Sequence, residues 1–145
     1  RSFFDDASLR RIRDLGFGLA HVDLPPARDH PPVSHPSLGS LGWVRLHGRN
    51  SDTWFDRHAH RDQKYDYLYD ARELREVAER VERIREETKR VVVVLNNHFR
   101  GQALANALQL KRAVIGRPVP APETIVEAYP GLAPDVTVVG QQRLF

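Results

Sequence analysis

VVVVLNNHFRGQALANALQL, from Val91 to Leu110, is the stretch from which the fold class follows. Its four valines and one leucine form an uninterrupted apolar run, typical of a strand buried on both faces in a parallel sheet. Three polar residues, Asn96 to His98, end the run, and Gly101 precedes a helical pattern over Gln102–Ile115. Ligands bind at the carboxyl ends of strands in such sheets, so the polar residues predict a site.

A long amphipathic helix is predicted immediately before this strand, over Asp70–Lys89. Asp70 and Glu73 have the spacing of a capping box, and the apolar residues form one stripe. Glu76 and Arg80, four residues apart, are expected to pair on the solvent side. The other predicted elements are a helix over Asp5–Leu15 and strands over Phe17–Leu24 and Gly42–Gly48. Helices that alternate with apolar strands predict an α/β fold.

Three segments lack a clean hydrophobic period. Pro25–Ser40 contains five prolines and is predicted to be a loop where a regular β/α unit would have a helix. Ser51–Tyr69 is polar and aromatic. The segment after residue 116 has five prolines in its first eighteen residues, with one helical turn expected near Glu123–Ala128 and a short strand or extended segment at Val136–Val139.

The composition is that of an ordinary globular protein. The 145 residues are 41% hydrophobic and 28% charged, which suffices for one modest domain. No apolar segment approaches the roughly 20 residues that cross a bilayer, so no membrane partner is expected. The absence of cysteine excludes disulfides and predicts a cytoplasmic location. The chain has no methionine and begins with Arg1, which indicates a fragment.

The net charge is mildly positive, +3, and arginine far outnumbers lysine. Most of these arginines alternate with glutamate in the helical stretches. This pattern favours a solvated, salt-bridged surface over a nucleic-acid footprint.

Three motifs occur in order: RLHGRN at Arg45–Asn50, YDYLYDARELREVAERV at Tyr65–Val81 and LNNHFRGQALANALQL at Leu95–Leu110. Together they resemble the YecE-like family, the domain of unknown function numbered 72. Complete members resemble a TIM-type β/α barrel. The resemblance implies that residues 1–116 are the carboxyl-terminal half of such a barrel, followed by a Pro-rich tail over residues 117–145. It implies no activity, and the likeness of the barrel to sugar isomerases and abasic-site endonucleases is only an analogy of fold.

Seven polar residues lie at or just after the ends of the predicted strands and form the leading candidate site: Asp23, Arg45, His47, Arg49, Asn96, Asn97 and His98. The arginines are expected to bind a phosphate or carboxylate, and the asparagines and Asp23 to complete the ligand site. His47 or His98 is expected to act as catalytic acid or base. The predicted ligand is a small anionic, hydroxyl-bearing molecule, such as a sugar phosphate or a nucleic-acid backbone segment. The reaction, if there is one, would be hydrolysis or isomerisation.

Two other interpretations of these residues stay open. One is a buried polar network that fixes the strand ends without a ligand. The other is a metal site of His21, Asp23, His47 and His98, but no tight ligand spacing supports it, so no metal is predicted. No cofactor is predicted either, because both Gly-rich phosphate-binding motifs are absent. Tyr65, Tyr67 and Tyr69 either pack a loop or stack on sugars or bases.

The last five residues, QQRLF, resemble the short peptide with which bacterial replication and repair proteins bind the sliding clamp. Gln141 would fill a polar pocket, and Leu144 and Phe145 an apolar one. The second hypothesis is therefore a DNA-maintenance accessory protein recruited through this tail. A third is a non-catalytic fragment that needs the missing half-barrel.

Overall fold

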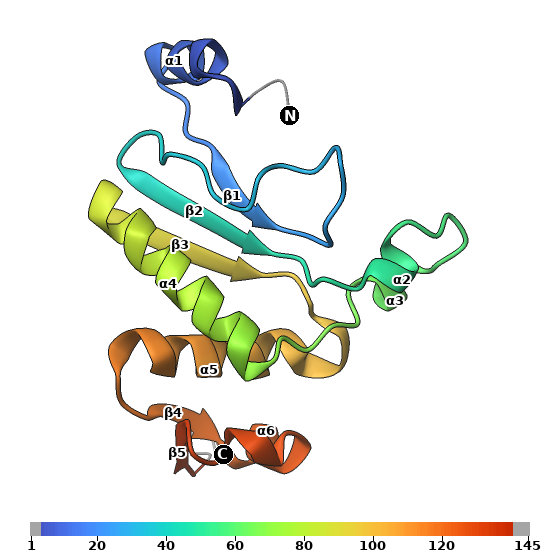
Figure 1. Ribbon diagram of the computed structural model, residues 1–145. Coiled ribbons are helices and arrows are strands. Elements are labelled where there is room, and N and C mark those ends of the chain that lie inside the picture. The colour runs from blue at the N-terminus through green and yellow to red at the C-terminus, as the bar shows by residue number, and fades with distance from the viewer. Residues whose placement is uncertain (1–3, 141–145) are drawn as a thin grey trace, which may run out of the picture.

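Three parallel strands form the main sheet in the order β1-β2-β3 (Figure 1). They are β1 Ala20–Asp23, β2 Leu41–Leu46 and β3 Arg90–Leu95. The computed structural model describes residues 4–140. The strands run in the same direction, so their carboxyl ends meet at one edge. The predicted α/β class with a parallel sheet is confirmed.

The long helix α4, Ala71–Glu87, covers one face of this sheet. Its amino terminus has the predicted capping box: Asp70 Oδ1 accepts from the Glu73 N–H at 2.8 Å, and Glu73 Oε2 accepts from the Asp70 N–H at 3.0 Å. The core contains Val44 and Leu46 of β2 with Leu74, Val77, Val81 and Ile84 of α4. Gly42 lets the helix approach closely, because a Cβ there would overlap the Ile84 side chain.

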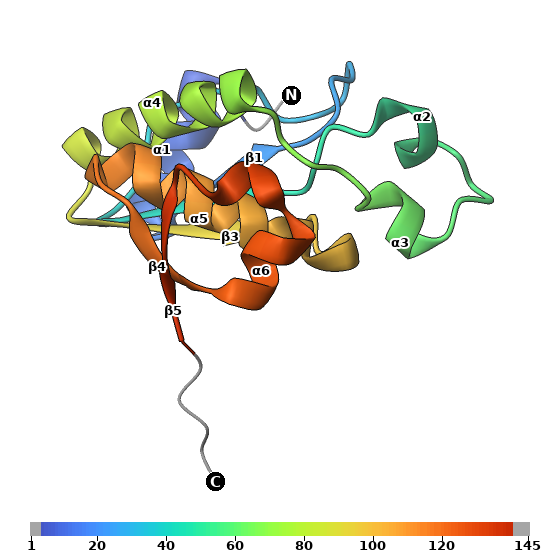
Figure 2. The same ribbon diagram turned by 90° about the horizontal axis from the view of Figure 1, so that it is seen from below.

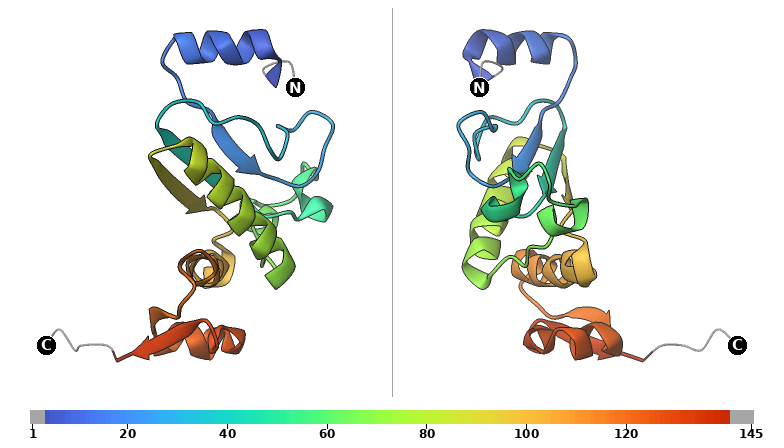
Figure 3. Two further views of the ribbon diagram at one scale, coloured as in Figure 1. Left: turned by 60° about the vertical axis from the view of Figure 1, so that its left-hand side comes forward. Right: turned by 90° about the vertical axis from the view of Figure 1, so that its right-hand side faces the viewer.

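A second helix, α5 (Gln102–Ile115), packs against α4 and β3. The 3-10 turn η2, Phe99–Gly101, joins it to the strand, and Gly116 ends it with a left-handed φ of +74°. Figure 3 shows α4 lying along one face of the strands.

The other face of the sheet is open among residues 4–140. Trp43 and Arg45 alternate with the buried residues of β2 and are exposed, and their neighbours in register on β3 are Val92 and Val94. All of Val91–Leu95 are only partly buried. The prediction that this strand is buried on both faces is therefore wrong for this chain, because helices cover one face and β3 lies at the sheet edge.

The remaining amino-terminal elements are short. Helix α1, Asp6–Asp14, is capped at its amino terminus by Asp5, whose side chain accepts a hydrogen bond from the Ser8 N–H at 2.8 Å. A loop joins β1 to β2 where a regular unit would have a helix, as predicted. The segment Ser51–Tyr69, which lacks a clean hydrophobic period, contains two one-turn helices, α2 Ser51–Trp54 and α3 Arg61–Lys64.

The carboxyl-terminal segment is more regular than its proline content suggests. Strands β4 Val119–Pro122 and β5 Val136–Val139 pair in parallel, with α6 Glu123–Ala128 and η3 Pro130–Leu132 between them. A small core with Ala105 packs this unit against α5 (Figure 2). The expected helical turn and strand are confirmed, and the domain boundary at residue 116 stays a prediction. No helix within residues 4–140 is long and apolar enough to cross a membrane.

Candidate functional site

Asp23 lies at the end of β1 on the helix-covered side of the sheet, with 2% of its surface exposed. Its Oδ1 accepts from Arg49 Nε at 2.8 Å and the Tyr69 hydroxyl at 2.9 Å. Its Oδ2 accepts from Arg49 Nη2 at 2.9 Å and Arg80 Nη2 at 2.8 Å. Burial raises the pKa of Asp23, but hydrogen bonds and charges from the two arginines outweigh it and hold the pKa below its usual value.

Arg80 was expected on the solvent side of α4, and that expectation is wrong. Its side chain is 4% exposed and paired with Asp23. The buried Asp23 carboxylate needs hydrogen-bond donors that are buried with it. Helix α4 supplies one from Arg80, a position that the hydrophobic pattern of the helix predicts to be exposed to solvent. Its expected partner Glu76 instead pairs with Arg49 and, at 3.7 Å, with Arg72.

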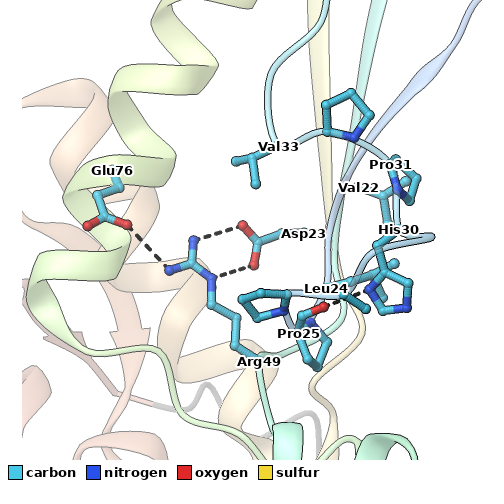
Figure 4. Close-up of a pocket in the computed structure, with 12 residues that line it drawn as sticks. Val22, Asp23, Leu24, Pro25, His30, Pro31, Val33, Arg49 and Glu76 are labelled. Carbon is cyan, nitrogen blue, oxygen red and sulfur yellow. Dashed lines mark hydrogen bonds and ion pairs between the residues drawn. The ribbon is translucent and has the colours of Figure 1, made fainter. Parts of the chain in front are cut away.

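Arg49 is neutralised by three carboxylates. Besides the pair to Asp23, its Nη1 donates to Glu73 Oε1 at 3.2 Å and to Glu76 Oε2 at 3.3 Å. The hydrogen bond to Asp23 is the main reason that the pKa of Arg49 is raised. Figure 4 shows the contacts of Arg49 with Asp23 and Glu76. Asp23 and Arg49, both expected to bind a ligand, therefore bind mainly to each other.

The same network holds the RLHGRN loop. The Tyr69 hydroxyl donates to Asp23 and accepts from the Gly48 N–H at 2.9 Å, while the His47 N–H donates to the Asp23 carbonyl at 3.0 Å. Gly48 has a φ of +90°, and a Cβ there would lie 2.7 Å from Tyr67 Cβ. Only glycine fits this turn without strain. The position of His47 is thus fixed by its neighbours on both sides.

Asn97 is fully buried. Its Nδ2 donates to the Tyr67 carbonyl at 2.8 Å and to Asn106 Oδ1 at 2.9 Å. Asn106 in turn exchanges two 3.0 Å hydrogen bonds with the Tyr69 backbone. Asn97 therefore fastens the tyrosine segment to α5. Sequence reasoning missed Asn106, although a polar residue on the apolar face of a helix was the available signal.

Arg45 and Asn96 lie together on the open face of the sheet. Arg45 Nε and Nη2 both donate to Asn96 Oδ1, at 3.2 and 3.1 Å. Asn96 is neutral, and no carboxylate in residues 4–140 forms an ion pair with Arg45. The guanidinium is exposed and keeps unused N–H groups. Arg45 therefore has the free positive charge that Arg49 lacks.

Four rings cluster around Tyr65. The Tyr65 ring centroid lies 5.9 Å from His47, 5.3 Å from His98 and 5.7 Å from Trp54, and the His47 and Trp54 centroids are 6.1 Å apart. Two of the predicted site residues, His47 and His98, thus come together with Tyr65 and Trp54. Of the three alternating tyrosines, Tyr65 joins this cluster, and the other two pack inward.

The two histidines differ in their surroundings. His98 Nδ1 lies 2.8 Å from the Asn96 carbonyl, so the neutral ring donates there and its Nε2 carries the lone pair. Burial, followed by the charge of Arg45, lowers the pKa of His47, and its Nδ1 is buried without a partner in the described chain. The lowered pKa of His47 favours its neutral imidazole, the form that accepts a proton.

The four residues considered for a metal do not meet. His21 stacks on His35, with centroids 4.0 Å apart, and lies with Asp23 on the helix side, whereas His47 and His98 contact Tyr65. Between residues 4 and 140, no group of three or more His, Cys, Asp or Glu side chains is placed to hold a metal ion. Gln141, Leu144 and Phe145 lie outside the described residues.

Comparisons with known proteins agree with the motif resemblance. No curated protein matches the chain. A DUF72 family protein from Thermotoga maritima MSB8 has a solved structure that is 32% identical, with a TM-score of 0.72, and the match covers 79% of this chain and 43% of that one. Two structures of a DUF72 family protein from Enterococcus faecalis V583 are 29% and 27% identical, both with TM-scores of 0.62, and cover 79% of this chain and 44% and 45% of theirs.

The chain therefore spans less than half the length of these relatives. The family described as protein of unknown function DUF72, which is the YecE-like family of the predicted resemblance, matches residues 1–125. The chain belongs to the DUF72 family.

Proposed function

We propose that the open face at the strand carboxyl ends binds a small anionic, hydroxyl-bearing ligand. The proposal rests on Arg45. The neutral amide of Asn96 orients its guanidinium, and no carboxylate among the described residues pairs with its charge. An exposed arginine held in one orientation is suited to a phosphate or carboxylate group. Asn96, which orients Arg45, is the positioning residue in this proposal.

The aromatic cluster supports a ligand with a flat or cyclic part. The Tyr65 and Trp54 ring centroids lie 5.7 Å apart, and both rings lie near His47, two residues after Arg45. Sugars and bases stack on such faces, and each stacked base contributes about 1–3 kcal/mol. A sugar phosphate fits both features, and a short segment of nucleic-acid backbone fits the same chemistry.

In its catalytic form the proposal assigns proton transfer to the two histidines. His98 presents Nε2 as the base, with the Asn96 carbonyl fixing the ring through Nδ1. Burial and Arg45 keep His47 neutral, so it is the second candidate for the same role. Such groups suit a hydrolase or an isomerase.

We also infer that the open face is the inner wall of a larger β/α barrel. Two points support this: the strands are parallel with helices on one side, and the solved relatives are more than twice as long as the matched region. In a barrel, the strand carboxyl ends form the active-site mouth. The remaining strands would then complete the site, and the chain alone would provide only part of any activity.

A titration with ribose 5-phosphate tests the ligand proposal, with binding followed by calorimetry in the full-length protein. Arg45→Gln should weaken binding about tenfold or more, because it removes a charge-assisted hydrogen bond. Arg117→Gln, which removes an exposed arginine far from the strand ends, is the matched control. Equal affinities for both variants would remove Arg45 from the site.

A further inference from the structure

A pocket of about 400 Å³ lies on the helix side of the sheet, between the loop after β1 and helix α4 (Figure 4). It occupies the place where a regular β/α unit would pack a helix. One end is ionic, with Asp23, Arg49 and Glu76, and His30 lies at the other. The apolar lining consists of Val22, Leu24, Pro25, Pro26, Ala27, Pro31, Pro32 and Val33.

The walls of the pocket offer few free hydrogen-bond donors. Four of the lining residues are prolines, which have no N–H. His30 Nδ1 lies 2.6 Å from the Pro25 carbonyl, so the neutral ring donates there and leaves Nε2 as an acceptor. A ligand that fits these walls is apolar along its length and rich in donors at its polar end.

The ionic end of the pocket also has few free hydrogen-bond donors. Both oxygens of Asp23 are saturated, and four of the five N–H groups of Arg49 already point at carboxylates. Glu76 is the third carboxylate on this one arginine, and its side chain is 50% exposed. Its other neighbour, Arg72, is 3.7 Å away and 76% exposed, where water screens the pair strongly. The accessible group at this end is therefore a carboxylate.

We propose that this pocket binds a small organic cation, a primary ammonium or guanidinium on a short apolar stem. The cationic head lies at Glu76, and the stem packs against the prolines and Val33. None of these contacts involves the aromatic cluster at the open face, so this site is independent of the proposed function.

The test is a nuclear magnetic resonance titration of the chain with three probes of equal length: n-butylammonium, n-butanol and butyrate. We expect n-butylammonium to shift amide signals of residues 22–33 and of Glu76, with weaker shifts from n-butanol and none from butyrate. Glu76→Gln should weaken n-butylammonium binding about fivefold. Glu79→Gln, an exposed glutamate on the same helix that does not line the pocket, should leave it unchanged.

Amide spectra of both variants check that the fold is kept, since both side chains are well exposed. Equal shifts from the three probes, no shifts at residues 22–33, or unchanged binding in Glu76→Gln would each overturn the proposal. Weaker binding in Glu79→Gln to the same extent would also overturn it, because the effect would then come from the charge of the whole helix.

Discussion

Arg49 donates two hydrogen bonds to the Asp23 carboxylate, from Nε to Oδ1 at 2.8 Å and from Nη2 to Oδ2 at 2.9 Å. Arg45, four residues earlier, donates both of its bonds to a neutral amide on the opposite side of the sheet. The two arginines of the RLHGRN motif therefore differ in their partners and in their roles. Arg49 holds the fold together, and Arg45 is available to a ligand.

Replacing Asp23 should destabilise the protein severely. In Asp23→Asn, the buried Arg80 and the half-buried Arg49 lose the carboxylate that neutralises them, and breaking a buried pair costs about 3–5 kcal/mol. Chemical denaturation measures the free energy of unfolding. Asp29→Asn removes an exposed carboxylate from the next loop and is the control. A loss below about 1 kcal/mol in Asp23→Asn would show that the network contributes little.

Gly48→Ala should also be destabilising. A Cβ at this position would meet Tyr67 Cβ at 2.7 Å, and the φ of +90° is unfavourable for alanine. Strain and overpacking together cost about 2 kcal/mol or more. Gly131→Ala is the matched control, because nothing lies within 4 Å of its added Cβ. Thermal unfolding of the two variants should therefore differ clearly, and equal melting temperatures would contradict this account of the turn.

Acid should weaken the fold through His21. Burial, together with the charges of His35 and Arg80, lowers the pKa of His21 from 6.5 to about 4. The unfolded chain binds a proton near pH 6.5 and the folded chain does not, so stability is full above that pH and is lost as the pH falls towards 4. At about 1.4 kcal/mol per pH unit, the loss is on the order of 3 kcal/mol.

The measurement is the free energy of unfolding between pH 7 and pH 4. His21→Gln should flatten this dependence, whereas His58→Gln, which removes an exposed histidine, should keep it. The depressed carboxyl pKa of Asp23 contributes mainly at lower pH, whereas the lowered pKa of His47 adds to the loss in the same range and persists in His21→Gln. An unchanged slope in His21→Gln would assign the acid sensitivity to other groups.

The tail hypothesis predicts a separate loss. Deleting residues 141–145 should abolish binding to a bacterial sliding clamp in calorimetry, since Gln141, Leu144 and Phe145 supply the whole docking peptide in that hypothesis. Shuffling the same five residues is the control for length. Clamp binding that survives the deletion, or no binding by the intact chain, would end this hypothesis.

Local patterns in the sequence predicted the elements well. The capping box at Asp70, the apolar stripe of α4 and the valine run each depend on neighbours a few residues apart, and each element formed as expected. The predicted strands also indicated that the polar residues at their carboxyl ends lie at one edge of the sheet, because the strands are parallel. These features are encoded in short stretches of chain.

The side of the sheet that each polar residue faces could not be predicted in the same way. Asp23 pairs with Arg80 across 57 residues, and Asn97 depends on Asn106 of a packed helix. Such contacts follow from how α4 and α5 lie on the sheet, which no local period contains. The sequence therefore grouped Arg49 with Arg45, although their partners give them opposite roles.

A crystal structure of the full-length protein with ribose 5-phosphate would show directly whether Arg45 binds the phosphate. We expect a phosphate within hydrogen-bond distance of the Arg45 guanidinium on the open face, with the sugar against Tyr65. A phosphate bound to Arg49 on the helix side, or an open face without ligand at a saturating concentration, would contradict it.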